Sequence, residues 1–272
     1  MLVALQTGQG RLDFLVRGEQ FTSYGYGDER AVPGFSELNA PGRRAVTREE
    51  EPGGLALCLV HGNVEGVAFG VDGQGEPGRI VTLEMTARRG SQTVGFQQEC
   101  AWIVPDGRRL LTEARTARVH PGPGEARILD LSFRLVASEE QAVSFGRTEE
   151  SFLRVRAASS LFPSGGGQVR NSEGTYDADG IHGRSAAWVA CVGVVQAETV
   201  GFAFLDHPDN PWHPPPWIAR EDGTLSPSPF AWREMELAAS RAIFLRYRLI
   251  VHRGYVDQGW ADARLAEYVR EA

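Results

Sequence analysis

The sequence contains no lysine, so its 28 Lys+Arg residues are all arginines. This absence excludes lysine Schiff-base chemistry and a phosphate-binding P-loop, because both depend on a lysine amine. The formal net charge of −7 argues against nucleic-acid binding, since no basic surplus is available to displace counterions. We therefore expect no nucleic-acid partner.

Cysteines and long apolar segments are also scarce. The three cysteines, Cys58, Cys100 and Cys191, show no CxxC spacing and predict neither a disulfide framework nor a zinc site. The N-terminus lacks the charged and apolar regions of a signal peptide, and no stretch approaches the length of a membrane span. We expect a cytoplasmic protein with no membrane partner and no cofactor.

The residues that are present favour strands. Apolar and polar residues alternate over Arg79–Ala87, Val94–Val104, Arg109–Val119 and Arg127–Val136, with turn signals between them. These segments predict four long antiparallel strands in a meander. The only convincing amphipathic helix is Asp262–Val269. The prediction is a single all-β domain over residues 1–272, a large antiparallel β-sandwich of the supersandwich type with a short C-terminal helix.

Two segments are too irregular for strands. Tyr24–Thr47 is rich in Gly, Pro and Asn, and a loop of that length is either suspect or functional. Leu205–Trp217 follows a buried strand that Pro208 and Pro211 bring to an end. This second loop carries Asp206, His207, Asn210, Trp212, His213 and Trp217. It is either a rigid site at a strand end or a proline-rich bend whose aromatic residues cap the core.

Short motifs from about Leu12 to Tyr255 resemble one known family. In order they are Tyr24 with Tyr26-Gly27, Pro41-Gly42 with Thr47, Val60-His61-Gly62-Asn63-Val64-Glu65-Gly66-Val67, Trp102-Ile103-Val104-Pro105-Asp106-Gly107 with Leu111-Thr112-Glu113, Asn171-Ser172-Glu173-Gly174, Leu205-Asp206-His207-Pro208, and Leu245-Arg246-Tyr247-Arg248 with Val251-His252. Together they resemble the bacterial family labelled methane oxygenase PmoA, a domain of unknown function. A methane monooxygenase subunit would need a membrane span, which this sequence lacks, so we set that activity aside.

The resemblance implies a sandwich similar to the galactose mutarotase-like group. Because relatives occur alongside sugar-processing genes, it also implies a sugar ligand. One departure concerns the segment before the motif that contains His61. Family members usually carry His-Pro-His-His there, whereas this chain has Glu51-Pro52-Gly53-Gly54. Any metal or acid–base step that used those histidines would be lost or changed in this protein.

Sugar conversion by an epimerase or lyase needs one base and one acid within hydrogen-bond reach of the ring. We assign Glu173 as the base and His207 as the acid, and expect both to face an open cleft together with His61. The candidate substrate-binding residues are His61, Asn171, Arg184, Asn210, Trp212, His213 and Trp217. The tryptophans would stack on a pyranose face. Each of these residues could instead have a purely structural role. Glu173 would then be an ordinary carboxylate in a turn, and the tryptophans would fill the core.

Three functions are consistent with this pattern. The first is a carbohydrate-active protein that binds or converts a sugar, as an epimerase, lyase or hydrolase if it is an enzyme. The second is a non-catalytic binding or scaffold protein of the same fold that has lost the histidine cluster. A metal-dependent oxidoreductase is third, and we expect no metal because no HxH or HExxH spacing is present. The expected partner is a small sugar or sugar derivative, and pairing of sheet edges into a homodimer is left open.

Overall fold

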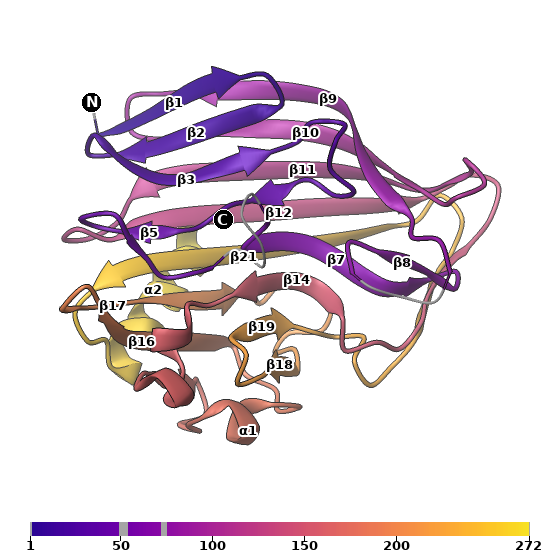
Figure 1. Ribbon diagram of the computed structural model, residues 1–272. Coiled ribbons are helices and arrows are strands. Elements are labelled where there is room, and N and C mark those ends of the chain that lie inside the picture. The colour runs from indigo at the N-terminus through magenta and orange to yellow at the C-terminus, as the bar shows by residue number, and fades with distance from the viewer. Residues whose placement is uncertain (1, 49–53, 72–74, 272) are drawn as a thin grey trace.

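Two antiparallel sheets stacked face to face form the body of the protein in the computed structural model (Figure 1). The structure describes residues 2–48, 54–71 and 75–271. All strand pairings within these sheets are antiparallel. The prediction of an all-β sandwich with large antiparallel sheets and a short C-terminal helix is confirmed.

The larger sheet has eleven strands and lies toward the viewer in Figure 1. Its main path runs in the order β1 (Val3–Gly8), β2 (Arg11–Val16), β3 (Glu19–Gly25), β4 (Gly34–Phe35), β7 (Leu57–Val64), β14 (Ser151–Arg156), β19 (Thr224–Pro227) and β18 (Trp217–Ala219). Three short strands lie off this path, β8 (Val67–Phe69), β13 (Val143–Phe145) and β20 (Met235–Leu237). Neighbours such as β7 and β14 are far apart in the chain, so long connections are needed to build this sheet.

The smaller sheet has eight longer strands. Its order is β15 (Gln168–Asn171), β16 (Trp188–Val195), β17 (Glu198–Asp206), β21 (Ala242–Arg253), β12 (Arg127–Ala137), β11 (Arg109–Pro121), β10 (Val94–Ile103) and β9 (Arg79–Arg89). The last four pair in sequence order, which confirms the predicted meander. A separate hairpin of β5 (Asn39–Ala40) and β6 (Arg44–Ala45) makes a two-stranded sheet.

Strand alternation assigns one face of the smaller sheet to the sandwich core and the other to a helix. Phe202 and Phe204 of β17 belong to the main core, whereas Ala203 and Leu205 belong to a second apolar cluster. That second cluster includes Ala261 and Tyr268 of α2 (Gln258–Glu271), so α2 covers the outer face. The helix is longer than the predicted Asp262–Val269.

The interior between the sheets contains a buried ion pair. Glu113 and Arg115 point inward from β11, and Arg115 Nε donates to Glu113 Oε1 at 2.6 Å. Trp102 Nε1 donates to Glu113 Oε2 at 2.8 Å, and Arg115 Nη1 donates to Tyr24 Oη at 2.8 Å. Burial raises the pKa of Tyr24, so its hydroxyl stays neutral. The buried charges are thus compensated by each other and by hydrogen bonds, as their desolvation requires.

The remaining helical segments are short. They are α1 (Ala178–Ile181) and two 3₁₀ turns, η1 (Ser159–Leu161) and η2 (Pro163–Gly165). Within the described ranges, no helix combines the length and apolar character required to cross a membrane.

Candidate functional site

The proline-rich loop after β17 is held by a buried carboxylate. Asp206 Oδ1 accepts from Asn210 Nδ2 at 2.7 Å, and Asp206 Oδ2 lies 2.7 Å from His213 Nδ1, which donates to it. Asn210 also bonds both backbone groups of Arg246 on β21, at 2.7 and 2.8 Å. Burial raises the pKa of Asp206, although the hydrogen bonds from His213 and Asn210 oppose that rise. The loop is therefore fixed to the sheet by its own polar side chains.

His207 points away from this network, toward α2. Its side chain is only 2 % exposed, and its ring meets the ring of Tyr268 edge-on at 4.9 Å between centroids. His207 Nδ1 accepts a hydrogen bond from the backbone N–H of Asp209 at 3.1 Å. Burial lowers the pKa of His207, which favours the neutral imidazole. The predicted acid therefore lies beneath the C-terminal helix.

The two tryptophans of the loop differ in accessibility. Trp217 is fully buried, and its Nε1 donates to the carbonyl oxygen of Ala186 at 2.8 Å. Its ring packs edge-on against Phe204 in the core. Trp212 is partly buried and contacts Phe230 at 5.0 Å between ring centroids. Only Trp212 keeps part of its ring on the surface.

The motif Asn171-Ser172-Glu173-Gly174 forms a tight turn at the end of β15 (Gln168–Asn171). Asn171 is fully buried, and its Oδ1 accepts from the backbone N–H groups of Glu173 and Thr175 at 3.0 and 2.9 Å. Glu173 is exposed and accepts a hydrogen bond from Ser172 Oγ at 2.9 Å. Arg184 is also exposed. Asn171 thus shapes the turn, whereas Glu173 and Arg184 face solvent.

His61 on β7 lies in an aromatic cage of the larger sheet. Its ring centroid is 5.2 to 5.7 Å from those of Phe145, Phe152 and Phe230. Neither imidazole nitrogen has a hydrogen-bond partner in the described part of the chain. Burial lowers the pKa of His61 to about 3. His61 is therefore a neutral core residue.

The structure thus groups some predicted site residues and separates others. It brings His213 and Asn210 together around Asp206. His61 and His207 lie in different apolar surroundings, and Glu173 is exposed on a turn. These last three side chains do not share one cleft.

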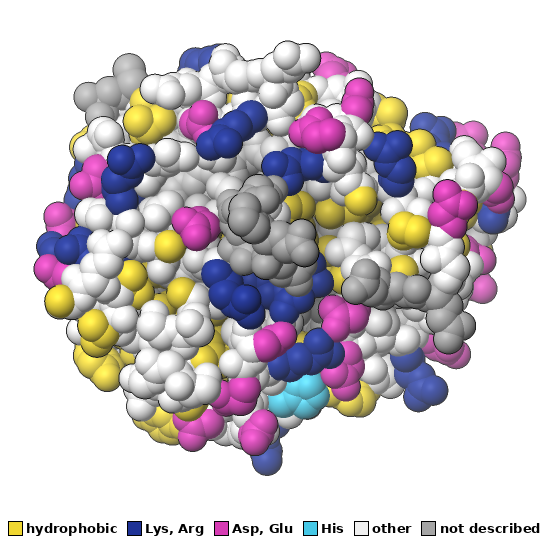
Figure 2. Space-filling model, in the orientation of Figure 1, with side chains coloured by type: hydrophobic (Ala, Val, Ile, Leu, Met, Phe, Trp, Pro, Cys, Tyr) yellow, Lys and Arg dark blue, Asp and Glu magenta, His cyan; other side chains and the backbone are white. Residues whose placement is uncertain are grey.

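A cavity of about 630 Å³ opens on the face of the larger sheet that is turned away from the smaller sheet. Figure 2 shows a group of cationic side chains near the centre of this side of the molecule, with acidic side chains around it. The cavity is lined by side chains from separate segments, of which the polar ones are Glu29, Arg30, Glu150, Arg154 and Arg156. The predicted long loop Tyr24–Thr47 supplies two of them.

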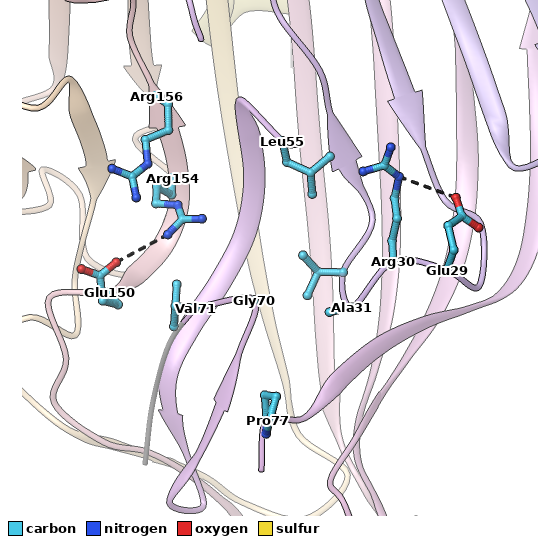
Figure 3. A pocket seen from close by; sticks show the side chains of 11 residues that line it. Glu29, Arg30, Ala31, Leu55, Gly70, Val71, Pro77, Glu150, Arg154 and Arg156 are labelled. Carbon is cyan, nitrogen blue, oxygen red and sulfur yellow. Dashed lines mark ion pairs between the residues drawn. The ribbon is translucent and has the colours of Figure 1, made fainter. Parts of the chain in front are cut away.

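One wall of the cavity is the strand β14. Arg154 and Arg156 are two residues apart, so they project from the same face of the strand (Figure 3). Arg154 Nη1 lies 3.6 Å from Glu150 Oε2, and Arg156 Nη1 donates to Asp222 Oδ2 at 2.9 Å. Both guanidinium groups are largely shielded, with side-chain exposures of 9 % and 14 %. Their charges therefore act in a partly desolvated setting, where they are stronger than in water.

The opposite wall comes from the loop between β3 and β4. Arg30 Nε lies 3.8 Å from Glu29 Oε1, and in Figure 3 Arg30 lies between Leu55 and Glu29. Apolar side chains of Val32, Leu55 and Val71 complete the lining. The cavity thus joins apolar surface to cationic groups on two sides.

Gly70 allows the segment after β8 to turn back over β7. Its φ of 71° lies in the left-handed region, and a Cβ there would be 2.9 Å from Cγ1 of Val60. A larger residue would displace this part of the cavity lining.

The charged side chains around the cavity form a network of ion pairs. Three arginines and two glutamates line the cavity, and Glu150 is shared with Arg220, whose Nη1 donates to Glu150 Oε1 at 2.6 Å. Asp222 is also committed, since it accepts from Arg156 Nη1 and from the backbone N–H of Thr224. Desolvation is the largest influence on the pKa of Asp222 and raises it, but the hydrogen bonds from Thr224 and the charges of Arg156 and Arg220 together outweigh it, so the pKa is lowered. The cavity thus combines cationic and acidic side chains.

Metal coordination has no support among the described residues. No group of three or more His, Cys, Asp or Glu side chains there is arranged to hold an ion. Residues 51–53 of the Glu51–Gly54 segment lie outside the described part of the chain. Gly54 is described and directly precedes Leu55 of the cavity lining.

The arginine-lined cavity was not predicted from sequence. The Arg154-Val155-Arg156 alternation signals that two arginines share a strand face, but it does not indicate whether other segments enclose that face. The irregular composition of Tyr24–Thr47 indicated that this segment could be functional, but it did not identify which of its residues line the cavity.

Comparison with known proteins places the chain in a family. No curated protein gives a significant match. A family model described as a family of unknown function (DUF6807) matches residues 11–266, nearly the whole of both sheets and most of α2. The chain therefore belongs to this family of unknown function.

Proposed function

We propose that the protein binds a small carbohydrate that carries a carboxylate, such as a uronic acid, in the arginine-lined cavity. The observation that carries this proposal is the pair Arg154 and Arg156, which present two guanidinium groups from one strand face to one cavity. Guanidinium groups bind carboxylates through two parallel hydrogen bonds, which gives both affinity and orientation.

The rest of the lining favours a sugar acid over a simple anion. Val32, Leu55 and Val71 offer apolar surface to the C–H face of a ring, and Glu29 and Glu150 offer acceptors for hydroxyl groups. A volume of about 630 Å³ lies within the range of small-molecule sites and has room for more than one pyranose. A cavity lined only by polar groups would bind inorganic phosphate as well as a sugar acid. This lining is partly apolar and therefore favours a ligand that has both apolar and polar faces.

The resemblance to the PmoA-labelled family and to mutarotase-like sandwiches is a second, independent reason to propose a sugar ligand. Acid–base conversion by Glu173 and His207 stays a prediction, as do the sugar contacts assigned to His61, Asn171, Arg184, Asn210, Trp212, His213 and Trp217. A cytoplasmic location and a homodimer also stay predictions. The alternative, a non-catalytic binding protein, requires only the cavity and not the acid–base pair.

Calorimetric titration and thermal unfolding test the proposal. Glucuronate and galacturonate should bind and raise the melting temperature, since a ligand at a hundred times its Kd adds about 2.7 kcal/mol of stability. Glucose and galactose test the need for the carboxylate, and inorganic phosphate tests whether any anion suffices. Arg154→Gln and Arg156→Gln should abolish binding, whereas Arg270→Gln, an exposed arginine on α2, should not.

Two outcomes contradict the proposal. One is equal binding of phosphate and uronates, which would make the cavity a general anion site. The other is uronate binding that survives both cavity substitutions. If uronates bind, proton NMR of the same mixtures distinguishes an enzyme, which changes the sugar, from a binding protein, which leaves it intact.

A further inference from the structure

A second cavity, of about 370 Å³, lies at the other layer of the sandwich, beside the start of α2. Its walls are the turn between β11 and β12, the end of β21 and the first turn of the helix. The lining residues with polar or aromatic side chains are Glu125, His252, Arg253, Tyr255 and Trp260. None of them takes part in the arginine-lined cavity.

His252 places a buried hydrogen-bond acceptor in this wall. Its Nδ1 lies 3.1 Å from the carbonyl oxygen of Gly254, so Nδ1 must be the protonated nitrogen that donates. Burial lowers the pKa of His252 to about 4, which keeps the ring neutral near pH 7 and leaves Nε2 with a lone pair. Nε2 has no partner among the described residues, and the residue is only 3 % exposed. This nitrogen has almost no accessible surface, so the imidazole forms the wall behind Trp260 and is not itself a ligand contact.

Aromatic surface adjoins that acceptor. The Trp260 ring lies 5.3 Å from the His252 ring, and Trp260 is partly exposed. Tyr255 is 74 % exposed, more than any other large hydrophobic residue in the described part of the chain. An exposed tyrosine beside a partly exposed tryptophan offers flat apolar surface with a polar edge, which matches the C–H face of a sugar.

The charged groups at the rim balance one another. Arg253 Nη1 donates to Glu125 Oε2 at 3.2 Å, and Arg253 Nε donates to Glu198 Oε2 at 2.9 Å. Such a paired rim supplies both donors and acceptors without a strong net charge. It therefore favours a neutral ligand with many hydroxyl groups over an anion.

We propose that this cavity is a binding site for a neutral saccharide, separate from the arginine-lined cavity. One pyranose ring stacks on Tyr255 and Trp260, and its hydroxyls bond to Glu125 and Arg253 at the rim. The volume suits about one ring, so a longer chain would extend past Tyr255 into solvent.

Titrations of the full-length protein with glucose, galactose, xylose, cellobiose and maltose, followed by calorimetry and tryptophan fluorescence, test the proposal. At least one of these saccharides should bind in the millimolar range or tighter. Tyr255→Ala removes an exposed ring and should leave folding intact, yet it should weaken binding about 3- to 10-fold. Tyr176→Ala is the matched control, because Tyr176 is also an exposed tyrosine but does not line this cavity.

A second pair of variants tests whether the saccharide binds in this cavity or in the arginine-lined cavity. Arg154→Gln should leave binding of the neutral saccharide unchanged, and Glu125→Ala should weaken it. The proposal is overturned if none of the five saccharides binds, or if Tyr255→Ala binds as well as the parent protein. It is also overturned if tetramethylammonium binds more tightly than the saccharides, since the aromatic rings would then serve a cation.

Discussion

Arginines occur in two contrasting settings in this sandwich. Arg115 lies between the sheets, where Glu113 binds its Nε at 2.6 Å and Tyr24 binds its Nη1. Arg154 lies on the outer side of the larger sheet beside a cavity, 3.6 Å from a glutamate that Arg220 holds more closely, at 2.6 Å. Arg115 thus belongs to a buried network between the sheets, whereas Arg154 lines a cavity, where we propose that it contacts a ligand.

Replacing Arg115 should have the largest effect on folding. Arg115→Met leaves the fully buried carboxylate of Glu113 with only the Trp102 indole as a hydrogen-bond donor. Loss of one partner of a buried ion pair costs about 3–5 kcal/mol, because the remaining charge stays desolvated. Urea denaturation followed by circular dichroism measures the change in free energy of unfolding.

The matched control removes both charges. Glu113→Gln combined with Arg115→Met should cost less than Arg115→Met alone, since no uncompensated carboxylate remains. A double variant that is less stable than the single variant would show that Arg115 acts through packing, and would remove the basis of the comparison.

A buried imidazole should make the fold sensitive to acid. His61 has a pKa of about 3 in the folded protein against about 6.5 in an unfolded chain. Because the unfolded chain binds the proton more readily, stability is retained above pH 6.5 and falls as the pH drops toward 3. By this linkage His61 alone should cost about 2 kcal/mol at pH 5 relative to pH 8.

The change can be assigned to His61 with a variant. His61→Phe keeps an aromatic ring among Phe145, Phe152 and Phe230 but cannot titrate. Denaturation measured at pH 5 and pH 8 should show a smaller difference for this variant than for the parent. His252, with a pKa of about 4, should preserve part of the dependence. An unchanged pH dependence would mean that His61 is protonated in the folded state.

The long strands could be predicted from sequence because their signals are local. From Arg79 to Ala137 each strand alternates in polarity and ends at a turn, so the meander follows from neighbouring residues. The same alternation put Glu113 and Arg115 on the face of Leu111, but did not reveal that the pair is buried.

The sites could be predicted only in part. Prolines in the loop after β17 signalled a rigid segment, and Asp206, Asn210 and His213 do cluster there. The cage around His61 depends on Phe145 and Phe230, which are distant in sequence. The arginine-lined cavity requires β14 to pair with β7, a long-range pairing that no local pattern encodes.

Replacing Arg154 should affect stability less than replacing Arg115. In Arg154→Gln the carboxylate of Glu150 keeps its hydrogen bond from Arg220, so Glu150 is not left without a partner. We expect a loss of about 1 kcal/mol in the free energy of unfolding. The same urea denaturation measures it, and a loss as large as that of Arg115→Met would show that Arg154 is structural and would end the contrast.

Replacing Glu173 should change stability least, within about 0.5 kcal/mol, because this side chain is exposed and bonds only a neighbouring hydroxyl. Asn171→Ala is the informative partner, since Asn171 Oδ1 accepts two backbone N–H groups in the same turn and its loss should cost about 1–2 kcal/mol. If Glu173→Gln folds normally, a loss of sugar conversion in this variant would result from the missing carboxylate and not from unfolding. If Glu173→Gln instead leaves both uronate binding and turnover intact, the base predicted from the sequence is a turn residue, and the cavity carboxylate Glu150 becomes the group to replace next.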